Sequence, residues 1–308
     1  MHRTLSLTVP PAATAALARE LAALDEVVGL SVTAGASLKP PGDVLTVHVL
    51  NRGMDKVLKC VAANQDNGTI SAATAELASI IDSEHSEAVA NDVDEAIWEE
   101  MEAGLRHQGR VTSNYLALMA AGGVVAAVGL VSTDTPQAIA FVAASVIAPG
   151  FEPLVKIPLG LVLRRWAVLR LGLVSASAGY AVLIVAAALT FLCLRAGGGV
   201  ELREFVENPE LHRLGHPTAK DLVVSGAAAL AGAVMVSAFR RSVIAGPLIA
   251  LVTIHAAAAV GVGLVVGRFE LAGQATRRLG LDIALILPLC AAVFALKQIF
   301  VHRRRSLV

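Results

Sequence analysis

The residues best suited to chemistry lie in one apolar stretch, residues 143–160, which carries Glu152 and Lys156 one helical turn apart. Ionisable side chains at membrane depth are costly and usually mark a function. Glu152 precedes Pro153, a residue favoured at the first position of a helix, so its carboxylate is expected near the positive end of a half-helix. One interpretation is a site for a cation or proton coupled to transport. The other is a buried Glu152–Lys156 pair that fixes a kink.

Three prolines interrupt the same stretch. Because proline has no backbone N–H, a continuous helix would leave three carbonyl oxygens without donors, those of Ser145, Pro149 and Leu154. Lipid cannot satisfy such groups, and broken backbone at membrane depth is tolerated only where it is buried in protein or faces a water-filled cavity. We therefore expect an unwound helix and a substrate or ion site whose local members are Ser145, Pro149, Glu152, Pro153 and Lys156.

The composition places this stretch in an integral membrane protein. Of the 308 residues, 56% are hydrophobic and only 16% are charged, which is far more apolar than a typical soluble domain. The formal net charge is zero, so the overall charge indicates no nucleic-acid partner. The sequence has no nucleophile elbow, phosphate-binding loop, zinc helix or dinucleotide fingerprint, and we expect neither an enzyme nor a cofactor.

Metal binding is not favoured. His212 and His216 have a spacing that fits one helix face, but Gly215 and Pro217 argue against a stable helix there, and no third ligand is near. The cysteines are far apart in the sequence and are predicted to be free thiols: Cys60, Cys193 and Cys290.

Six hydrophobic segments follow residue 115. Their approximate bounds are 115–132, 137–163, 168–194, 222–238, 242–266 and 279–297. The second is too long for a straight span of about 20 residues, as expected for a kinked or discontinuous helix. The predicted fold class is an α-helical membrane protein with about six transmembrane helices over residues 113–300 and the lipid bilayer as its surroundings.

The membrane part resembles itself at an offset of 103 residues. Residues that coincide include Gly123 with Gly226, Gly129 with Gly232, Gly160 with Gly263, and Arg165 with Arg268. Three spans per copy mean that the second copy, about 216–300, enters the membrane from the opposite side to the first, about 113–196. This is the inverted three-plus-three plan common in secondary transporters.

In this register Glu152 is equivalent to His255, so His255 joins the candidate site. A packed, hydrogen-bonded core histidine is an equally good interpretation of His255. Asp282 lies near the start of the last segment, where we expect it to snorkel to the interface.

Residues 1–81 are predicted to form a small soluble domain. Their patterns follow the order strand, helix, strand, strand, helix, strand, which predicts an α+β ferredoxin-like sandwich of the ACT type. Because such modules commonly pair through their sheets, we expect a homo-oligomer. Residues 82–112 are predicted to form one charged amphipathic helix, lying on the membrane surface or acting as a solvated connector. Residues 301–308 are a basic tail.

The basic residues near the segment ends set the orientation. With the N-terminal domain in the cytoplasm, the inside receives Arg106, Arg110, Arg164, Arg165, Arg240, Arg241, Lys297, Arg303, Arg304 and Arg305. The acidic segment 201–210 falls outside, but so do several basic residues, which reduces the bias: Arg203, Arg213, Lys220, Arg268, Arg277 and Arg278. This predicts a multi-pass protein of a prokaryotic inner or plasma membrane with both termini in the cytoplasm.

Three parts of the sequence carry a family resemblance: SNYLALMAAGGVVAAVGL (Ser113–Leu130), the TDTPQ that follows, and VIAP (Val146–Pro149) with Pro153. They resemble the hydrophobic membrane proteins called domain of unknown function 389, over about residues 90–275 and most specifically in the first half. The resemblance implies an N-terminal domain of the predicted kind and no known activity. The family pattern lacks an acid at the position of Glu152 and has Gly-Ala-Met at residues 143–145.

Two functional hypotheses follow. The first is a transporter or channel for a small solute or ion, with a cytoplasmic regulatory or oligomerisation domain. The second is a non-transporting scaffold or sensor in which the broken helix is structural and the soluble domain binds a ligand or partner. A membrane-embedded enzyme is the weakest alternative, because the ionisable residues provide no evident nucleophile and base.

Overall fold

The structure is a computed structural model that describes residues 2–107, 110–238 and 245–304. Arg240, Arg241 and Arg305, which contributed to the predicted orientation, lie outside the described residues. The chain divides into two compact units. One comprises Met1–Glu100 with His302–Val308, and the other comprises Met101–Val301.

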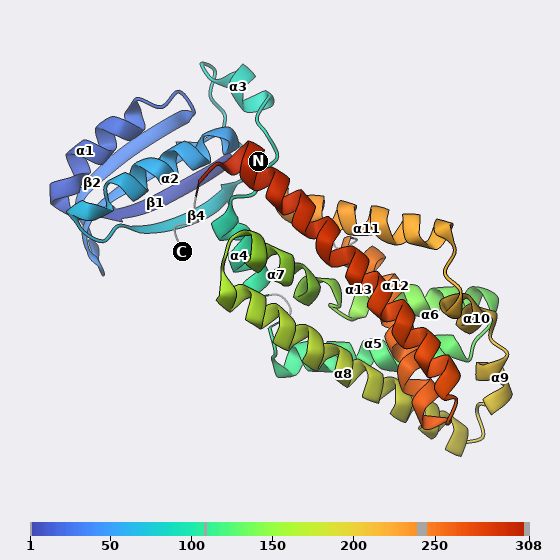
Figure 1. The fold of residues 1–308 in the computed structure, drawn as a ribbon. Coiled ribbons are helices and arrows are strands. Elements are labelled where there is room, and N and C mark those ends of the chain that lie inside the picture. The colour runs from blue at the N-terminus through green and yellow to red at the C-terminus, as the bar shows by residue number, and fades with distance from the viewer. Residues whose placement is uncertain (1, 108–109, 239–244, 305–308) are drawn as a thin grey trace. The chain divides into compact units, whose positions relative to one another are not determined.

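The first unit is built on a four-stranded antiparallel sheet with the strand order β2-β3-β1-β4 (Figure 1). Its elements are β1 (His2–Val9), α1 (Pro11–Ala22), β2 (Val27–Leu38), β3 (Pro41–Val49), η1 (Asn51–Gly53), α2 (Met54–Ala63), η2 (Gln65–Asn67) and β4 (Ser71–Leu77). This is the predicted succession of strands and helices. It is compatible with a ferredoxin-like unit.

Alternation along the strands sets the core of this unit. In β1, Leu5, Leu7 and Val9 are buried while Ser6 is exposed, as expected for a sheet covered on one face. Leu5 pairs across the sheet with Val47, which is also fully buried. The buried residues of α1 and α2 join these strand residues in one hydrophobic cluster.

The segment after the sheet forms two short helices instead of the single predicted connector. They are α3 (Ser86–Ala90) and α4 (Trp98–His107). Between them, Asp92 accepts hydrogen bonds from the backbone nitrogens of Asn51 (2.6 Å) and Arg52 (3.3 Å), and Asn51 Nδ2 donates to the carbonyl oxygen of Val93 (2.8 Å). These bonds hold residues 92 and 93 out of a helix, because their polar groups serve η1 instead.

The described end of the basic tail packs into the same unit. Arg304 donates to both carboxylate oxygens of Glu99 (2.7 Å each) and to Asp55 on α2. Asp55 also accepts from His302 Nδ1 at 2.9 Å, and the His302 ring lies 4.6 Å from the ring of Trp98. We call these five residues the tail clamp. It joins the segment that precedes Met101 to the segment that follows Val301.

The tail clamp is electrostatic. Burial acts to raise the pKa of Asp55, but the hydrogen bond from His302 and the charge of Arg304 outweigh it, and the pKa lies below its ordinary value. An aspartate with a lowered pKa in the folded state stabilises that state above its unfolded pKa of about 3.9. This stabilisation is lost as the pH falls through the lower, folded-state pKa.

Removing the Arg304 guanidinium should therefore loosen α2. Losing one partner of a buried ion pair costs about 3–5 kcal/mol, because the remaining carboxylates are left uncompensated. In Arg304→Ala we expect amide hydrogen exchange in α2 to accelerate by about two to four powers of ten, measured on the full chain. The neighbouring Arg303 is exposed, so Arg303→Ala is the matched control and should leave exchange unchanged. Equal exchange in the two variants would contradict the clamp.

The second unit is helical throughout its described elements (Figure 1). They are α5 (Ser113–Leu130), α6 (Asp134–Ile147), α7 (Phe151–Val162), α8 (Trp166–Ala196), α9 (Leu202–Val206), α10 (Pro209–Gly215), α11 (Ala219–Ser237), α12 (Ala245–Val265), α13 (Phe269–Lys297) and the π-helix η3 (Gln298–His302) that continues α13. Helix α8 contacts α5, α7 and α12, and α13 contacts α7 and α12.

By length and apolar composition, four of these helices could cross a membrane: α5, α8, α11, and α13 with its extension to His302. Helices α6 and α7 meet at 49° and could together form a fifth span. In α12 the shorter part Thr253–Val265 is also apolar. These helices indicate a membrane protein.

The turns that end α7 and α12 share one backbone conformation. Arg165 N donates to Gly160 O (2.7 Å), and Arg268 N donates to Gly263 O (2.9 Å). The residue before each arginine has a left-handed φ, 55° at residue 164 and 70° at residue 267. Both glycines allow close approach of the next helix, since a Cβ atom would lie 2.5 Å and 3.0 Å from the backbone nitrogens of Leu169 and Ala272.

Candidate functional site

The apolar stretch 143–160 is broken at one place, between α6 and α7. Ala148 has an extended conformation (φ −84°, ψ 117°), and the helix resumes at Phe151. The expected unwinding is thus confined to residues 148–150. Pro153 is the third residue of α7, where the missing N–H would be unpaired in any helix, and Pro158 is accommodated inside the helix.

Tyr180 on α8 makes hydrogen bonds at the break. Its hydroxyl oxygen lies 3.3 Å from the carbonyl oxygen of Gly150 and 2.8 Å from Oγ1 of Thr253 on α12. A Cβ atom at Gly150 would approach the Tyr180 hydroxyl to 3.1 Å, so a glycine here keeps the carbonyl within reach. The interrupted backbone is therefore hydrogen-bonded to α8 and, through the Tyr180 hydroxyl, connected to α12.

Tyr115 on α5 makes a second bond of this kind. Its hydroxyl donates to the carbonyl oxygen of Ser175 on α8 at 2.8 Å. Gly179 provides the space, because a Cβ atom there would lie 2.0 Å from the Tyr115 hydroxyl oxygen. The chain has two tyrosines, and both lie in this region.

Glu152 and Lys156 bring charge to the break. Glu152 is in the first turn of α7, and its Oε2 atom is buried with no hydrogen-bond partner in the part of the chain that the structure describes. Lys156 is one turn further on, 0% exposed, and attracts the Glu152 carboxylate electrostatically. We call Gly150, Glu152, Lys156, Tyr180 and Thr253 the break group.

The other predicted local residues have structural positions. Ser145 is 3% exposed and donates its hydroxyl to the carbonyl oxygen of Val142 (2.7 Å) within α6. Pro149 lies in the break itself and is half-buried, while Pro153 is buried in the first turn of α7. These three residues shape the backbone around the break group.

His255 lies on a different side of α12. Its ring is 5.1 Å from the ring of Phe141 on α6. Thr253 is two residues earlier, which places the two side chains about 200° apart around the helix axis. Thr253 and Ile254 face the break, since a Cβ atom at Gly150 would lie 3.0 Å from Ile254 Cδ1. The structure therefore groups Glu152 with Tyr180 and Thr253, and His255 with α6.

Sequence analysis missed Tyr115, Tyr180 and Thr253. A signal was present, since both tyrosines of a chain of 308 residues fall inside hydrophobic segments. A tyrosine buried in an apolar surrounding usually finds a hydrogen-bond partner for its hydroxyl. That rule, combined with the carbonyls freed by Pro149, could have linked them to the break.

Asp282 differs from its predicted position at the interface. It is 0% exposed and accepts a hydrogen bond from Arg278 Nε at 2.9 Å on the same helix. Ser225 on α11 bridges the pair, accepting from Arg278 Nη2 and donating to Asp282 Oδ1, both at 3.2 Å. We call Arg278 and Asp282 the α13 ion pair. An arginine four residues earlier stabilises the buried charge, so Asp282 does not need to reach water.

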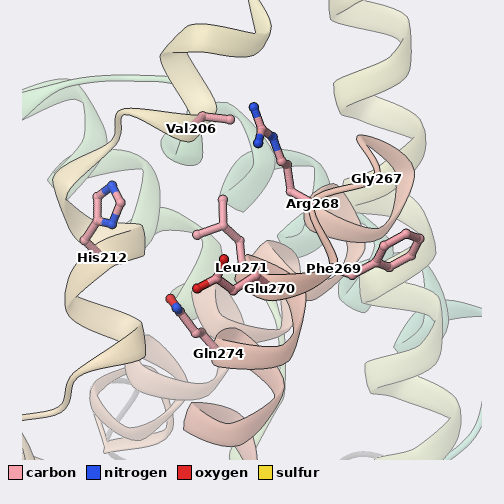
Figure 2. Close-up of a pocket in the computed structure, with 8 residues that line it drawn as sticks. All are labelled: Val206, His212, Gly267, Arg268, Phe269, Glu270, Leu271 and Gln274. Carbon is pink, nitrogen blue, oxygen red and sulfur yellow. The ribbon is translucent and has the colours of Figure 1, made fainter.

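A cavity of about 480 Å³ lies at the start of α13 (Figure 2). It is lined by Val206, His212, Gly267, Arg268, Phe269, Glu270, Leu271 and Gln274. His212 thus faces a cavity. Among the described residues no group of three or more His, Cys, Asp or Glu side chains could hold a metal ion.

The fold and the break group define a helical membrane protein with an interrupted helix. Residues 145–288 match the family model described as Domain of unknown function (DUF389), which confirms the resemblance seen in the sequence. The matched residues extend from α6 into α13. Ser113–Leu130 precedes the matched residues. No curated protein and no solved structure matches the chain.

Loss of the Tyr180 hydroxyl should destabilise the second unit. Tyr180→Phe removes the hydrogen bonds between the Tyr180 hydroxyl and both the Gly150 carbonyl and Thr253 Oγ1, at a cost of about 1 kcal/mol, and should lower the melting temperature of the purified full chain. Thr190→Val is a suitable control, because the Thr190 hydroxyl bonds only the carbonyl of Ala186 in its own helix (2.8 Å). A melting temperature of Tyr180→Phe equal to that of the control would show that the bond does not hold the break.

Proposed function

We propose that this protein is a transporter or channel for a small ion or solute and that the break group is its site. The observation that carries the proposal is a carboxylate oxygen of Glu152 that is buried without a partner among the described residues, beside a fully buried lysine. Such groups are costly in an apolar surrounding. An interrupted helix is also where secondary transporters place their ion and substrate sites.

The proposal includes an inverted repeat of two three-span halves. The two turns with a shared backbone support it, because residues 160, 164, 165 and 169 correspond to 263, 267, 268 and 272 at the offset of 103. Helix α8 begins at Trp166 and α13 at Phe269, which is the same offset. The contacts of α5 with α8 and of α11 with α13 are equivalent in this scheme.

In this proposal both termini are cytoplasmic, and the protein is a multi-pass protein of a prokaryotic cell membrane. The charges of Arg164 and Arg165 after α7 and the acidic residues of segment 201–210 support this orientation. The first unit would act as an ACT-like regulatory or oligomerisation domain, with a homo-oligomer as the functional form.

A scaffold or sensor is the second candidate. The tail clamp favours it, because the first unit binds both chain segments that flank the second unit. A ligand of the first unit could then act on the membrane helices without any transport. Under this alternative the break group is a structural joint.

The substitution Glu152→Gln tests transport directly. It keeps the size of the side chain and removes the charge, so we expect it to abolish proton movement in proteoliposomes loaded with pyranine and driven by a potassium diffusion potential. Glu207→Gln is the matched control, since the Glu207 side chain is 61% exposed. It should retain wild-type flux.

Two results would count against the proposal. Wild-type flux in Glu152→Gln would remove this residue from the mechanism. A wild-type protein that is folded in the vesicles and moves no protons would favour the scaffold or sensor.

A further inference from the structure

The α13 ion pair leaves part of its arginine uncommitted. A guanidinium has five N–H donors. Arg278 uses Nε for Asp282 and one Nη2 hydrogen for Ser225. Within the described part of the chain, Nη1 has no partner. The Nη1 side of this guanidinium therefore has N–H donors without an acceptor among the described residues, and we call it the open edge, although the Arg278 side chain is only 6% exposed.

Arg278 lies on the same face of α13 as two residues that line a cavity, about one helical turn beyond the nearer of them. Leu271 and Gln274 line the cavity of Figure 2. At 100° per residue these two side chains and Arg278 fall within about 60° around the axis of α13, and Arg278 lies about 6 Å beyond Gln274 along it. Gln274 is covered by α10, since a Cβ atom at Gly215 would lie 2.4 Å from its Oε1. Gln274 thus lies between the cavity and the ion pair.

We propose that Arg278 binds a small monocarboxylate that reaches it from this cavity. The chemistry follows from the present partners of Arg278, a carboxylate and a hydroxyl, because an external carboxylate can use the open edge in the same way. Asp282 already balances the charge of Arg278, and the Asp221 carboxylate on α11 also attracts Arg278. A ligand with one negative charge therefore leaves one uncompensated charge in the apolar unit, whereas a dianion such as sulfate would leave two.

The inference deepens the proposed function. As a binding site it stands on the α13 ion pair and the cavity; as the identity of a transported solute it rests on the transport proposal. The main alternative is a purely structural ion pair within α13 that Ser225 links to α11. That alternative predicts no response to carboxylates.

The experiment is a thermal unfolding titration of the purified full chain with sodium acetate, at constant ionic strength maintained with sodium chloride. We expect acetate to raise the wild-type melting temperature by about 2–4 °C once it exceeds its dissociation constant several-fold. Sodium sulfate stabilises proteins in general because it is excluded from their surface, so it should raise the melting temperatures of the wild type and of Arg278→Lys by the same amount. Arg278→Lys should abolish the acetate shift, because a lysine cannot form the two-bond fork. Arg277→Lys, at the exposed neighbouring position, should keep it.

A second variant keeps the test decisive if Arg278→Lys does not fold. Asp282→Asn removes the internal competitor for Arg278 while preserving its shape, so acetate should raise its melting temperature more than that of the wild type. An acetate shift in Arg278→Lys equal to that of the wild type, or no acetate shift in the wild type, would each overturn the inference. Acetate binding without flux would contradict transport and leave this site standing, whereas Glu152-dependent flux without acetate binding would do the reverse.

Discussion

The constraint on which the second unit depends is that polar groups at a helix break inside an apolar bundle must be held by hydrogen bonds. Pro149 interrupts the helix, and the carbonyl of Gly150, the N-cap residue of α7, accepts a hydrogen bond from the hydroxyl of Tyr180 in addition to its place in the helix. That hydroxyl also reaches Thr253, so one broken turn ties together α7, α8 and α12. An uninterrupted helix would pair its backbone N–H and C=O groups internally and would need no hydrogen bonds from other helices.

Charge is the second consequence of the break. The first turn of α7 places Glu152 where the helix dipole favours an anion, yet one of its oxygens has no partner among the described residues. The α13 ion pair shows how the same unit satisfies a buried carboxylate, with an arginine and a serine around it. The contrast suggests that Asp282 is held in place, whereas Glu152 is available to a ligand or proton.

The sequence predicted what depends on local pattern. Alternation located the strands of the first unit, apolar runs located the membrane helices, and Pro149 located the interruption. Two predictions from local pattern were wrong. Pro153 and Pro158 lie within α7 and do not interrupt it, and the segment 82–112 forms two helices where one was predicted. The break group could not be predicted in full, since Tyr180 and Thr253 are 73 residues apart. The offset of 103 residues that pairs Glu152 with His255 predicts an equal depth in the membrane for the two residues. It does not predict toward which neighbouring helix each side chain points.

The tail clamp shows the same limit at larger separation. Arg304 and Asp55 are 249 residues apart, and a cluster of arginines at a chain end more often indicates a solvated or membrane-facing tail. Here Arg304 is buried with two acidic partners. The composition of the tail was correctly seen as basic, but its acidic partners belong to α2 and α4, which only the folded chain brings to it.

The proposed ion or solute site at Glu152 depends on one condition, that water reaches the break in the membrane unit. It is tested most directly by reacting Glu152→Cys, in a chain without its three native cysteines, with a membrane-impermeant cationic thiosulfonate. Leu154→Cys, 2% exposed and two residues away on α7, provides the comparison. The account predicts that the cysteine at 152 reacts and the one at 154 does not. If neither cysteine reacts in folded protein, apolar side chains seal the break from water, and the proposed site is contradicted.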